Sequence, residues 1–128
     1  MLHIEGVDAV YGPVTALSGV NARIGKGELV GLLGANNAGK SSLMNVLSGI
    51  VPAARGRILF EGEDITRLPS KRRVELGIIQ VPEGRLVFPQ MTVRENLLMG
   101  GVNASAKPNR AREIERVAEL FPRLAERM

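Results

Sequence analysis

Residues 34–41 read Gly-Ala-Asn-Asn-Ala-Gly-Lys-Ser and match the pattern G-x-x-x-x-G-K-[ST] of a phosphate-binding loop. The stretch 29–33 before the loop is apolar, and Leu43, Val46 and Leu47 after it recur at helical spacing. A strand, a glycine loop and a helix in this order are the context that the pattern needs. Because residues 29–33 are apolar on both faces, we expect them to form a central strand in a covered sheet. A chance glycine-rich turn is the alternative, and the flanking segments argue against it.

The chemistry expected of this loop follows from its residue types. Glycines let the backbone wrap closely around a phosphate, so that several N–H groups point inward and the positive end of the following helix faces the same spot. The Lys40 ammonium supplies a full positive charge for the outer phosphates, and the Ser41 hydroxyl is a ligand for Mg²⁺. The loop therefore predicts binding of a nucleoside triphosphate.

The amino-acid composition bears on whether the chain binds nucleic acid, forms disulfides or crosses a membrane. The net charge of +4 is compatible with nucleic-acid binding. However, arginines and glutamates interleave along residues 110–119, as on a solvated helix face, and the chain has one Tyr, three Phe and no Trp for base stacking. We therefore expect no nucleic-acid partner. The chain has no cysteine, which excludes disulfides and thiolate metal sites, and no apolar run approaches the ~18 residues of a membrane span.

Turn and capping signals divide the rest of the chain into short elements. Strands are expected at residues 2–10, 16–24, 57–62 and 78–81. Helices are expected after the loop up to Gly49, at residues 69–76, and at 93–99 behind a capping box formed by Thr92 and Glu95. Residues 103–108 are predicted to be a loop, and a last helix carries an apolar stripe that includes Ile114 and Val117.

Several motifs together resemble the ATPase subunits of ABC transporters. They are Tyr11-Gly12 and the segments 34–42, 56–58, 62–66, 81–85 and 88–89. Segments 81–85, 91–97 and 121–124 are similar to those of the branched-chain amino-acid importer branch, and the resemblance covers essentially the whole chain. It implies an α/β fold: the P-loop NTPase core of ABC ATPase type with an N-terminal antiparallel β subdomain, incomplete at the C-terminus.

In that family fold, residues 1–28 and 56–66 would form the β subdomain, 29–55 and 77–84 the P-loop core, and 85–128 the start of a helical subdomain. The resemblance also implies a peripheral ATPase on the cytoplasmic face of a bacterial inner membrane, with ATP and Mg²⁺ as cofactors. The implied partners are integral-membrane permease subunits, a second ATPase subunit and, indirectly, a periplasmic binding protein. The energised process would be uptake of branched-chain amino acids or related amides.

The resemblance also implies which residues of this sequence form the site, position by position. Those expected to bind nucleotide are Tyr11, Gly34, Ala35, Asn36, Asn37, Ala38, Gly39, Lys40, Ser41 and Ser42; those expected to bind Mg²⁺ are Ser41 and Glu83. Tyr11 matches the aromatic residue that stacks on adenine, although it is also a plausible turn tyrosine. Glu83 stands at the glutamine of the Q-loop and is favoured over Gln80 because it directly follows Pro82, although it could equally be a surface carboxylate. No residue is assigned a catalytic role.

Two departures from the family pattern lead to further expectations. Asn37 occupies a loop position that is normally glycine; if that position needs a positive φ, Asn tolerates it better than most residues. The sequence ends at Met128 without a Leu-Ser-Gly-Gly-Gln signature, an apolar strand ending in Asp, or a histidine after the loop. Two hypotheses therefore stand: the N-terminal half of a hydrolysing transport subunit, which binds ATP without turnover by itself, or a non-catalytic nucleotide-binding polypeptide. Another P-loop class, such as a nucleotide kinase, would need a substrate-binding segment that the sequence does not contain.

Overall fold

In the computed structural model, which describes residues 1–128, the chain folds into two units. The first unit, Met1–Gln80, holds all the strands, and the second unit, Val81–Met128, is helical. The finer assignment of residues to three subdomains stays a prediction.

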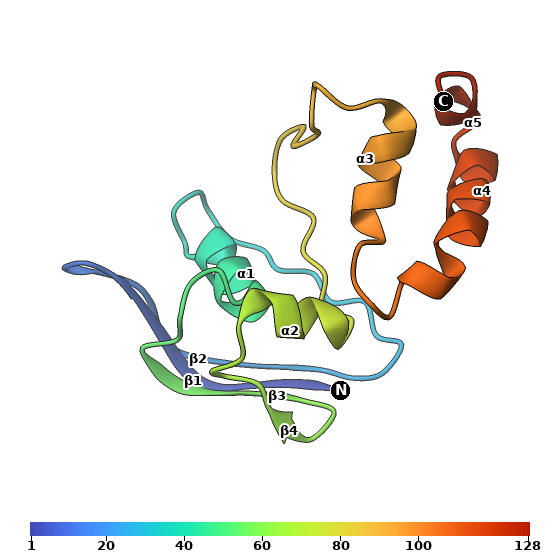
Figure 1. The fold of residues 1–128 in the computed structure, drawn as a ribbon. Helices are drawn as coiled ribbons and strands as arrows, with labels where there is room; N and C mark the ends of the chain where they lie inside the picture. Colours follow the sequence, from blue (N-terminus) through green and yellow to red (C-terminus); the bar gives the residue numbers. More distant parts are fainter. The chain divides into compact units, whose positions relative to one another are not determined.

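An antiparallel sheet of four strands forms the base of the first unit (Figure 1). Its strands are β1 (Leu2–Tyr11), β2 (Val14–Ile24), β3 (Arg55–Phe60) and β4 (Glu63–Asp64), in the order β2-β1-β3-β4. The register places Leu2 opposite both Ile24 and Phe60, so that β1 pairs along its length with β2 and β3. The predicted antiparallel strands are confirmed. β2 and β3 each begin two residues earlier than predicted, and the two-residue β4 was not predicted.

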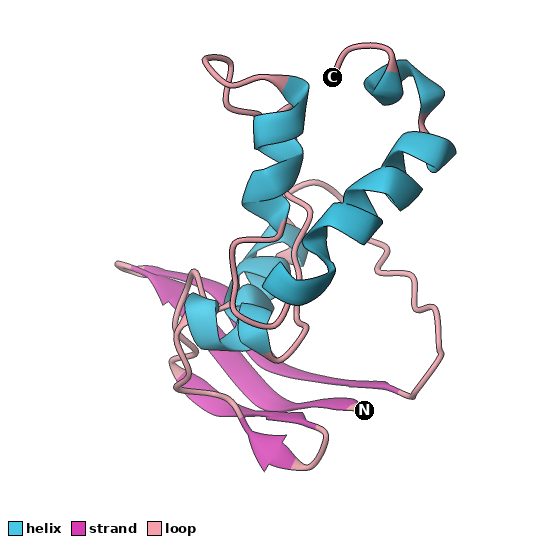
Figure 2. Ribbon diagram, turned by 45° about the vertical axis from the view of Figure 1, so that its right-hand side comes forward, coloured by secondary structure: helices cyan, strands magenta, loops and turns pink.

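Two helices, α1 (Lys40–Ser48) and α2 (Ser70–Glu75), lie over one face of this sheet, as Figure 2 shows. The core between the sheet and α1 is apolar and consists of Ile4, Val7, Ala9, Leu17, Leu43, Val46, Ile58 and Ile65. Leu43 and Val46 are three residues apart on α1, which is the helical spacing that the sequence showed. α1 ends at Gly49 in a left-handed conformation, so the predicted end of this helix is confirmed.

The two strands predicted for the P-loop core are absent. Residues 29–33 and 78–81 have no strand assignment, and neither segment joins the sheet. The side chains of Leu29 and Leu33 are 100% and 94% exposed, so the expectation of a buried central strand was wrong for this chain. The physical reason is that a strand exists through hydrogen bonds to its neighbours, and neither segment is paired with another strand in the structure.

The second unit consists of α3 (Val93–Gly100), a 3₁₀ turn (Lys107–Asn109), α4 (Arg110–Leu120) and the short α5 (Pro122–Ala125). The predicted capping box at the start of α3 is confirmed: the Thr92 hydroxyl accepts from the Glu95 backbone N–H, and the Glu95 carboxylate accepts from the Thr92 N–H at 2.8 Å. Ile114 is the buried residue of α4. The 3₁₀ turn inside the predicted loop and the helix α5 were not predicted.

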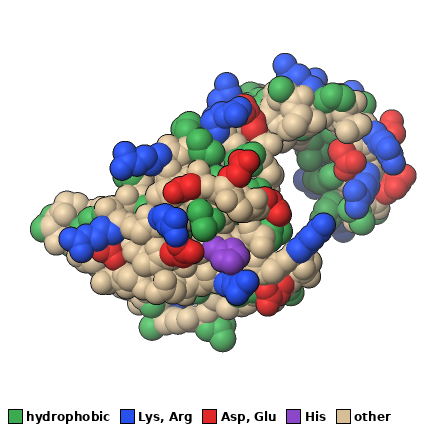
Figure 3. All heavy atoms as spheres, turned by 90° about the horizontal axis from the view of Figure 1, so that it is seen from below, with side chains coloured by type: hydrophobic (Ala, Val, Ile, Leu, Met, Phe, Trp, Pro, Cys, Tyr) green, Lys and Arg blue, Asp and Glu red, His purple; other side chains and the backbone are tan.

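Charged side chains of both signs are mixed on the surface. Over the face of the first unit seen in Figure 3, Lys and Arg alternate with Asp and Glu around the chain's single histidine. Ion pairs form between Arg57 and Glu5 at 2.6 Å and, within α4, between Arg116 and Glu113 at 3.6 Å. None of the helices has the length and the apolar character that a membrane-crossing helix needs.

Candidate nucleotide-binding site

The loop of residues 34–39 leads directly into α1, whose first two residues are Lys40 and Ser41. Gly39 precedes the helix with a φ of 96°, a conformation that side chains rarely adopt. A Cβ at Gly39 would stand 2.8 Å from the Ala16 carbonyl oxygen and 2.9 Å from a methyl carbon of Leu17. The loop therefore packs closely on β2, and glycine is required there both for its φ and for the space.

The N-terminus of α1 is left open to a ligand. No side chain caps it, and its first turn contains no acidic residue. The first N–H groups of any helix lack partners inside the helix. Here the positive end of the helix dipole and the free N–H groups of Lys40, Ser41 and Ser42 point toward the loop, which is the arrangement that binds phosphate.

Lys40 folds back over the beginning of the loop. Its ammonium group donates to the carbonyl oxygen of Gly34 and, at 3.0 Å, to that of Ala35. The Ala38 N–H donates to the Ala35 carbonyl at 3.1 Å, so the loop also closes a turn on itself. These bonds hold a full positive charge at the mouth of the loop.

Asn37 has a φ of 67°, and only one other non-glycine residue of the chain, Glu61, has a positive φ. The sequence left the sign of this angle open, and the structure shows the left-handed conformation. Asn enters this region more readily than most residues because its short polar side chain forms local hydrogen bonds. The departure from glycine at this position is therefore compatible with the loop geometry.

Tyr11 ends β1 at the hairpin turn, and its side chain is 43% exposed. The tip of the β1–β2 hairpin and the loop before α1 lie toward the same end of the first unit in Figure 1. The packing of Gly39 on Ala16 and Leu17 also brings the loop to the half of β2 that follows this turn. The ring is thus accessible on the side of the unit that carries the loop, and its stacking role stays a prediction.

The two candidate Mg²⁺ ligands come from different units. Ser41 stands in the first turn of α1, and Glu83 is an exposed residue of the second unit. No group of three or more His, Asp or Glu side chains in the chain could hold a metal ion. Mg²⁺ in nucleotide sites retains several waters and takes one or two protein oxygens together with phosphate oxygens. A hydroxyl and a carboxylate fit that demand, and the pair stays a prediction.

Gln80 and Arg73 contact α1 and were not selected from the sequence for this role. The Gln80 amide donates to the Asn45 side-chain oxygen on α1 at 3.2 Å, and its own oxygen is buried without a partner. Arg73, from α2, donates to backbone carbonyls at the end of α1. Backbone acceptors have no residue-type signature, so no sequence signal could have identified the Arg73 contacts.

Asp64, the one aspartate after the loop, has a structural role. Its carboxylate accepts from the backbone N–H and the hydroxyl of Thr66, and these hydrogen bonds lower the pKa of Asp64 below its usual value. The carboxylate therefore fixes the turn between β4 and α2.

The antiparallel sheet with a glycine loop and helix defines an ABC ATPase type of fold, and comparison with known proteins agrees with it. The family model described as ABC transporter matches residues 17–127, so the chain belongs to the ABC transporter family. The family predicted from the motifs is therefore confirmed.

Relatives with established names extend this result. The chain is 46% identical to the high-affinity branched-chain amino acid transport ATP-binding protein BraG of Pseudomonas aeruginosa, over 99% of this chain and 54% of the relative. It is 35% identical to the probable branched-chain amino acid transport ATP-binding protein LivG of Methanocaldococcus jannaschii, over 84% of this chain and 42% of the relative. The chain thus spans about half of the length of the curated relatives it matches.

Solved structures of ATP-binding cassettes are similar to the chain. A nucleotide-free cassette of an ABC transporter is 36% identical, with a TM-score of 0.74 over 81% of this chain and 41% of the other. A dimeric bacterial cassette, 23% identical with a TM-score of 0.76 over 98% of this chain, shares the fold.

Proposed function

We propose that this chain is the nucleotide-binding part of the ATP-binding subunit of an ABC importer, and that it binds MgATP through residues 34–42. The observation that carries the proposal is the loop itself: an uncapped helix N-terminus, a lysine held at the loop mouth, and a glycine that brings the loop onto β2. Membership of the family indicates that the nucleotide is ATP, because members of this family bind ATP.

Each site residue has a distinct task in this proposal. The backbone N–H groups of residues 38–42 bind the phosphates, and Lys40 leaves the carbonyls of Gly34 and Ala35 for the β- and γ-phosphates. Tyr11 stacks on the adenine, which adds affinity with little selectivity among bases. Ser41 and Glu83 would hold Mg²⁺, which when bound neutralises charge on the β- and γ-phosphate oxygens.

We propose further that the energised process is import of branched-chain amino acids. The names of BraG and LivG support this assignment. The proposal includes permease subunits and a second ATPase subunit as partners at the cytoplasmic face of a bacterial inner membrane, with a periplasmic binding protein acting indirectly. Deletion of the coding sequence should lower uptake of labelled leucine, isoleucine and valine and leave lysine uptake unchanged. Equal uptake of all four with and without the chain would contradict the assignment.

A second candidate function concerns residues 1–128 by themselves. We infer that they bind ATP without hydrolysing it, because they contain no acidic or histidine cluster that could complete the metal shell and orient water. Binding of ATP without stabilisation of the transition state lowers KM but leaves the activation barrier for hydrolysis high.

ATP binding is tested by replacing the loop lysine. Lys40→Ala should weaken MgATP binding by a factor of about 10–100, because a charge-assisted contact to phosphate contributes roughly 1.5–3 kcal/mol. Lys71→Ala is the matched control, since Lys71 is an exposed residue of α2 and its loss changes the net charge equally. Equal affinity in all three folded proteins would refute the proposal.

A further inference from the structure

Arg73 is the largest side chain that is fully buried in the protein, with 2% of its surface exposed. Its Nη1 donates to the carbonyl oxygens of Val46 and Leu47 at 2.7 and 2.9 Å. Both acceptors belong to the last turn of α1, whose C-terminal carbonyls lack partners inside the helix. The guanidinium therefore binds the end of α1 that lies opposite the phosphate-binding loop.

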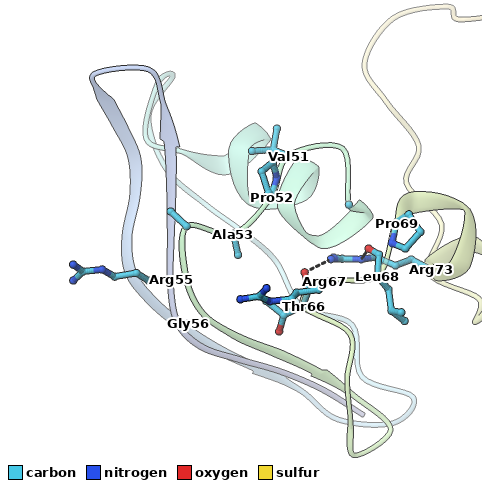
Figure 4. Close-up of a pocket in the computed structure, with 12 residues that line it drawn as sticks. Val51, Pro52, Ala53, Arg55, Gly56, Thr66, Arg67, Leu68, Pro69 and Arg73 are labelled. Carbon is cyan, nitrogen blue, oxygen red and sulfur yellow. Dashed lines mark hydrogen bonds between the residues drawn. The ribbon is translucent and has the colours of Figure 1, made fainter.

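The other donors of Arg73 reach a segment that is fixed on the sheet. Nε donates to the Leu68 carbonyl at 2.9 Å and Nη2 to the Thr66 carbonyl at 2.8 Å, as the dashed lines in Figure 4 show. The Thr66 hydroxyl accepts from the backbone N–H of Ile58, on β3, at 2.9 Å. A continuous set of hydrogen bonds thus joins β3, Thr66, Arg73 and α1.

No carboxylate neutralises this guanidinium. Arg73 belongs to none of the ion pairs of the chain, and burial lowers its pKa. A buried charge without a counter-ion is costly unless its donors are satisfied, and here backbone dipoles alone satisfy them. The negative end of the α1 dipole is among these dipoles, and α1 has no basic residue of its own in its last turn.

The packing around Arg73 is matched to its size. A Cβ at Gly49, the residue that ends α1, would lie 3.1 Å from Nε and 3.3 Å from Cδ of Arg73. Four of the five guanidinium N–H groups are used in these hydrogen bonds, and Arg55, which lines the adjacent hollow of about 540 Å³, points away from Arg73 in Figure 4. The hydrogen bonds of the Arg73 guanidinium therefore join parts of the fold to one another.

We propose that Arg73 is a positioning residue for the phosphate-binding loop. The nine residues of α1 span about 14 Å, and a helix of that length moves as a rigid rod. By fixing the far end of α1 to Thr66 and Leu68, Arg73 sets where Lys40 and Ser41 stand at the near end. The effect on ATP rests on the proposed function, whereas the effect on the loop does not.

The test compares two neighbouring arginines of α2. Arg73→Met removes the guanidinium and keeps an apolar stem, and Arg73→Lys restores the charge with fewer donors. Arg72→Met is the matched control, because Arg72 is exposed and pairs with Glu75 on the same helix. Two quantities are measured in this protein: the backbone amide NMR signals of Gly39, Ser41 and Ser42 without ligand, and the Kd for MgATP.

Arg73→Met should shift these amide signals and raise the Kd by roughly three- to tenfold, since small displacements of a binding group have effects of this size or larger. Arg73→Lys should restore both quantities in part, and Arg72→Met should change neither. Unchanged amide signals and an unchanged Kd in folded Arg73→Met would overturn the proposal.

If Arg73→Met does not fold, the measurements on Arg73→Lys decide whether Arg73 positions the loop. A lower Tm with wild-type amide signals and a wild-type Kd would then show that Arg73 contributes to stability alone, which overturns the proposal. If the wild-type protein does not bind MgATP, the proposed function fails, and the amide signals of the ligand-free variants still decide on Arg73.

Discussion

From the left-handed conformation of Asn37 we predict how substitutions at this residue change the affinity for nucleotide. The prediction depends only on backbone geometry. With a φ of 67°, Asn37 occupies a region that costs an ordinary L-residue about 1–2 kcal/mol. A β-branched side chain is among the least tolerant of a positive φ. In the ligand-free protein the loop of Asn37→Val can relax to a negative φ, whereas a bound phosphate requires the native path of the backbone.

The cost of restoring that path therefore appears in binding. A cost of about 1–2 kcal/mol corresponds to a Kd for MgATP that is roughly 5- to 30-fold higher in Asn37→Val. Asn37→Gly should bind MgATP as tightly as the wild-type protein or more tightly, because glycine adopts a positive φ without strain. The order of affinities is thus Gly, then Asn, then Val.

The control is at the same residue. Asn37→Gly and Asn37→Val both remove the side-chain amide of Asn37, but only valine is strained at a positive φ. Isothermal titration of the three proteins with MgATP, with folding checked by circular dichroism, separates the loss of the amide from the backbone strain. If Asn37→Val binds as tightly as Asn37→Gly, backbone strain at residue 37 does not limit affinity and the reasoning is refuted.

Three further predictions test the rest of the molecule. Purified residues 1–128 should release no more phosphate from ATP than their Lys40→Ala variant does, and turnover above that control would show that catalytic groups are present. Cysteines placed at Arg85 or Gln90 should crosslink to a co-expressed permease, and an assembled complex without adducts would contradict docking through this segment. The Thr92 hydrogen bonds lower the pKa of Glu95, so its stabilising effect is complete above the ordinary value of 4.5 and is lost as pH falls through the lowered pKa. Acid titration of helicity should therefore show a loss at low pH that is absent in Glu95→Gln, which has no carboxyl group to protonate, and identical curves would exclude Glu95 as its source.

Features that depend on neighbours in the sequence were predictable. The end of α1 at Gly49, the capping box at Thr92 and Glu95, and the loop itself follow from residues within a few positions of one another. Local hydrogen bonds and preferred φ values determine such features, and they leave a residue-type signature. The family resemblance rests on motifs of the same local kind.

Features that depend on distant partners were not predictable. The apolar pattern of residues 29–33 describes a strand that needs parallel neighbours, and the pattern cannot tell whether those neighbours are present. The sequence carries no signal that Arg73 is buried, because its acceptors on α1 are backbone carbonyls 26 and 27 residues away. Only the folded structure brings them together.

The exposed stretch 29–33 has a consequence for the behaviour of residues 1–128 in concentrated solution. It is apolar and uncharged, and its backbone is not paired with any strand. A segment of this kind is a template for β-augmentation, in which another polypeptide adds its own strand. We therefore expect residues 1–128 to self-associate through this stretch as protein concentration rises. Substituting Leu29 or Leu33 with lysine should suppress it, because a charged side chain disfavours intermolecular strand pairing.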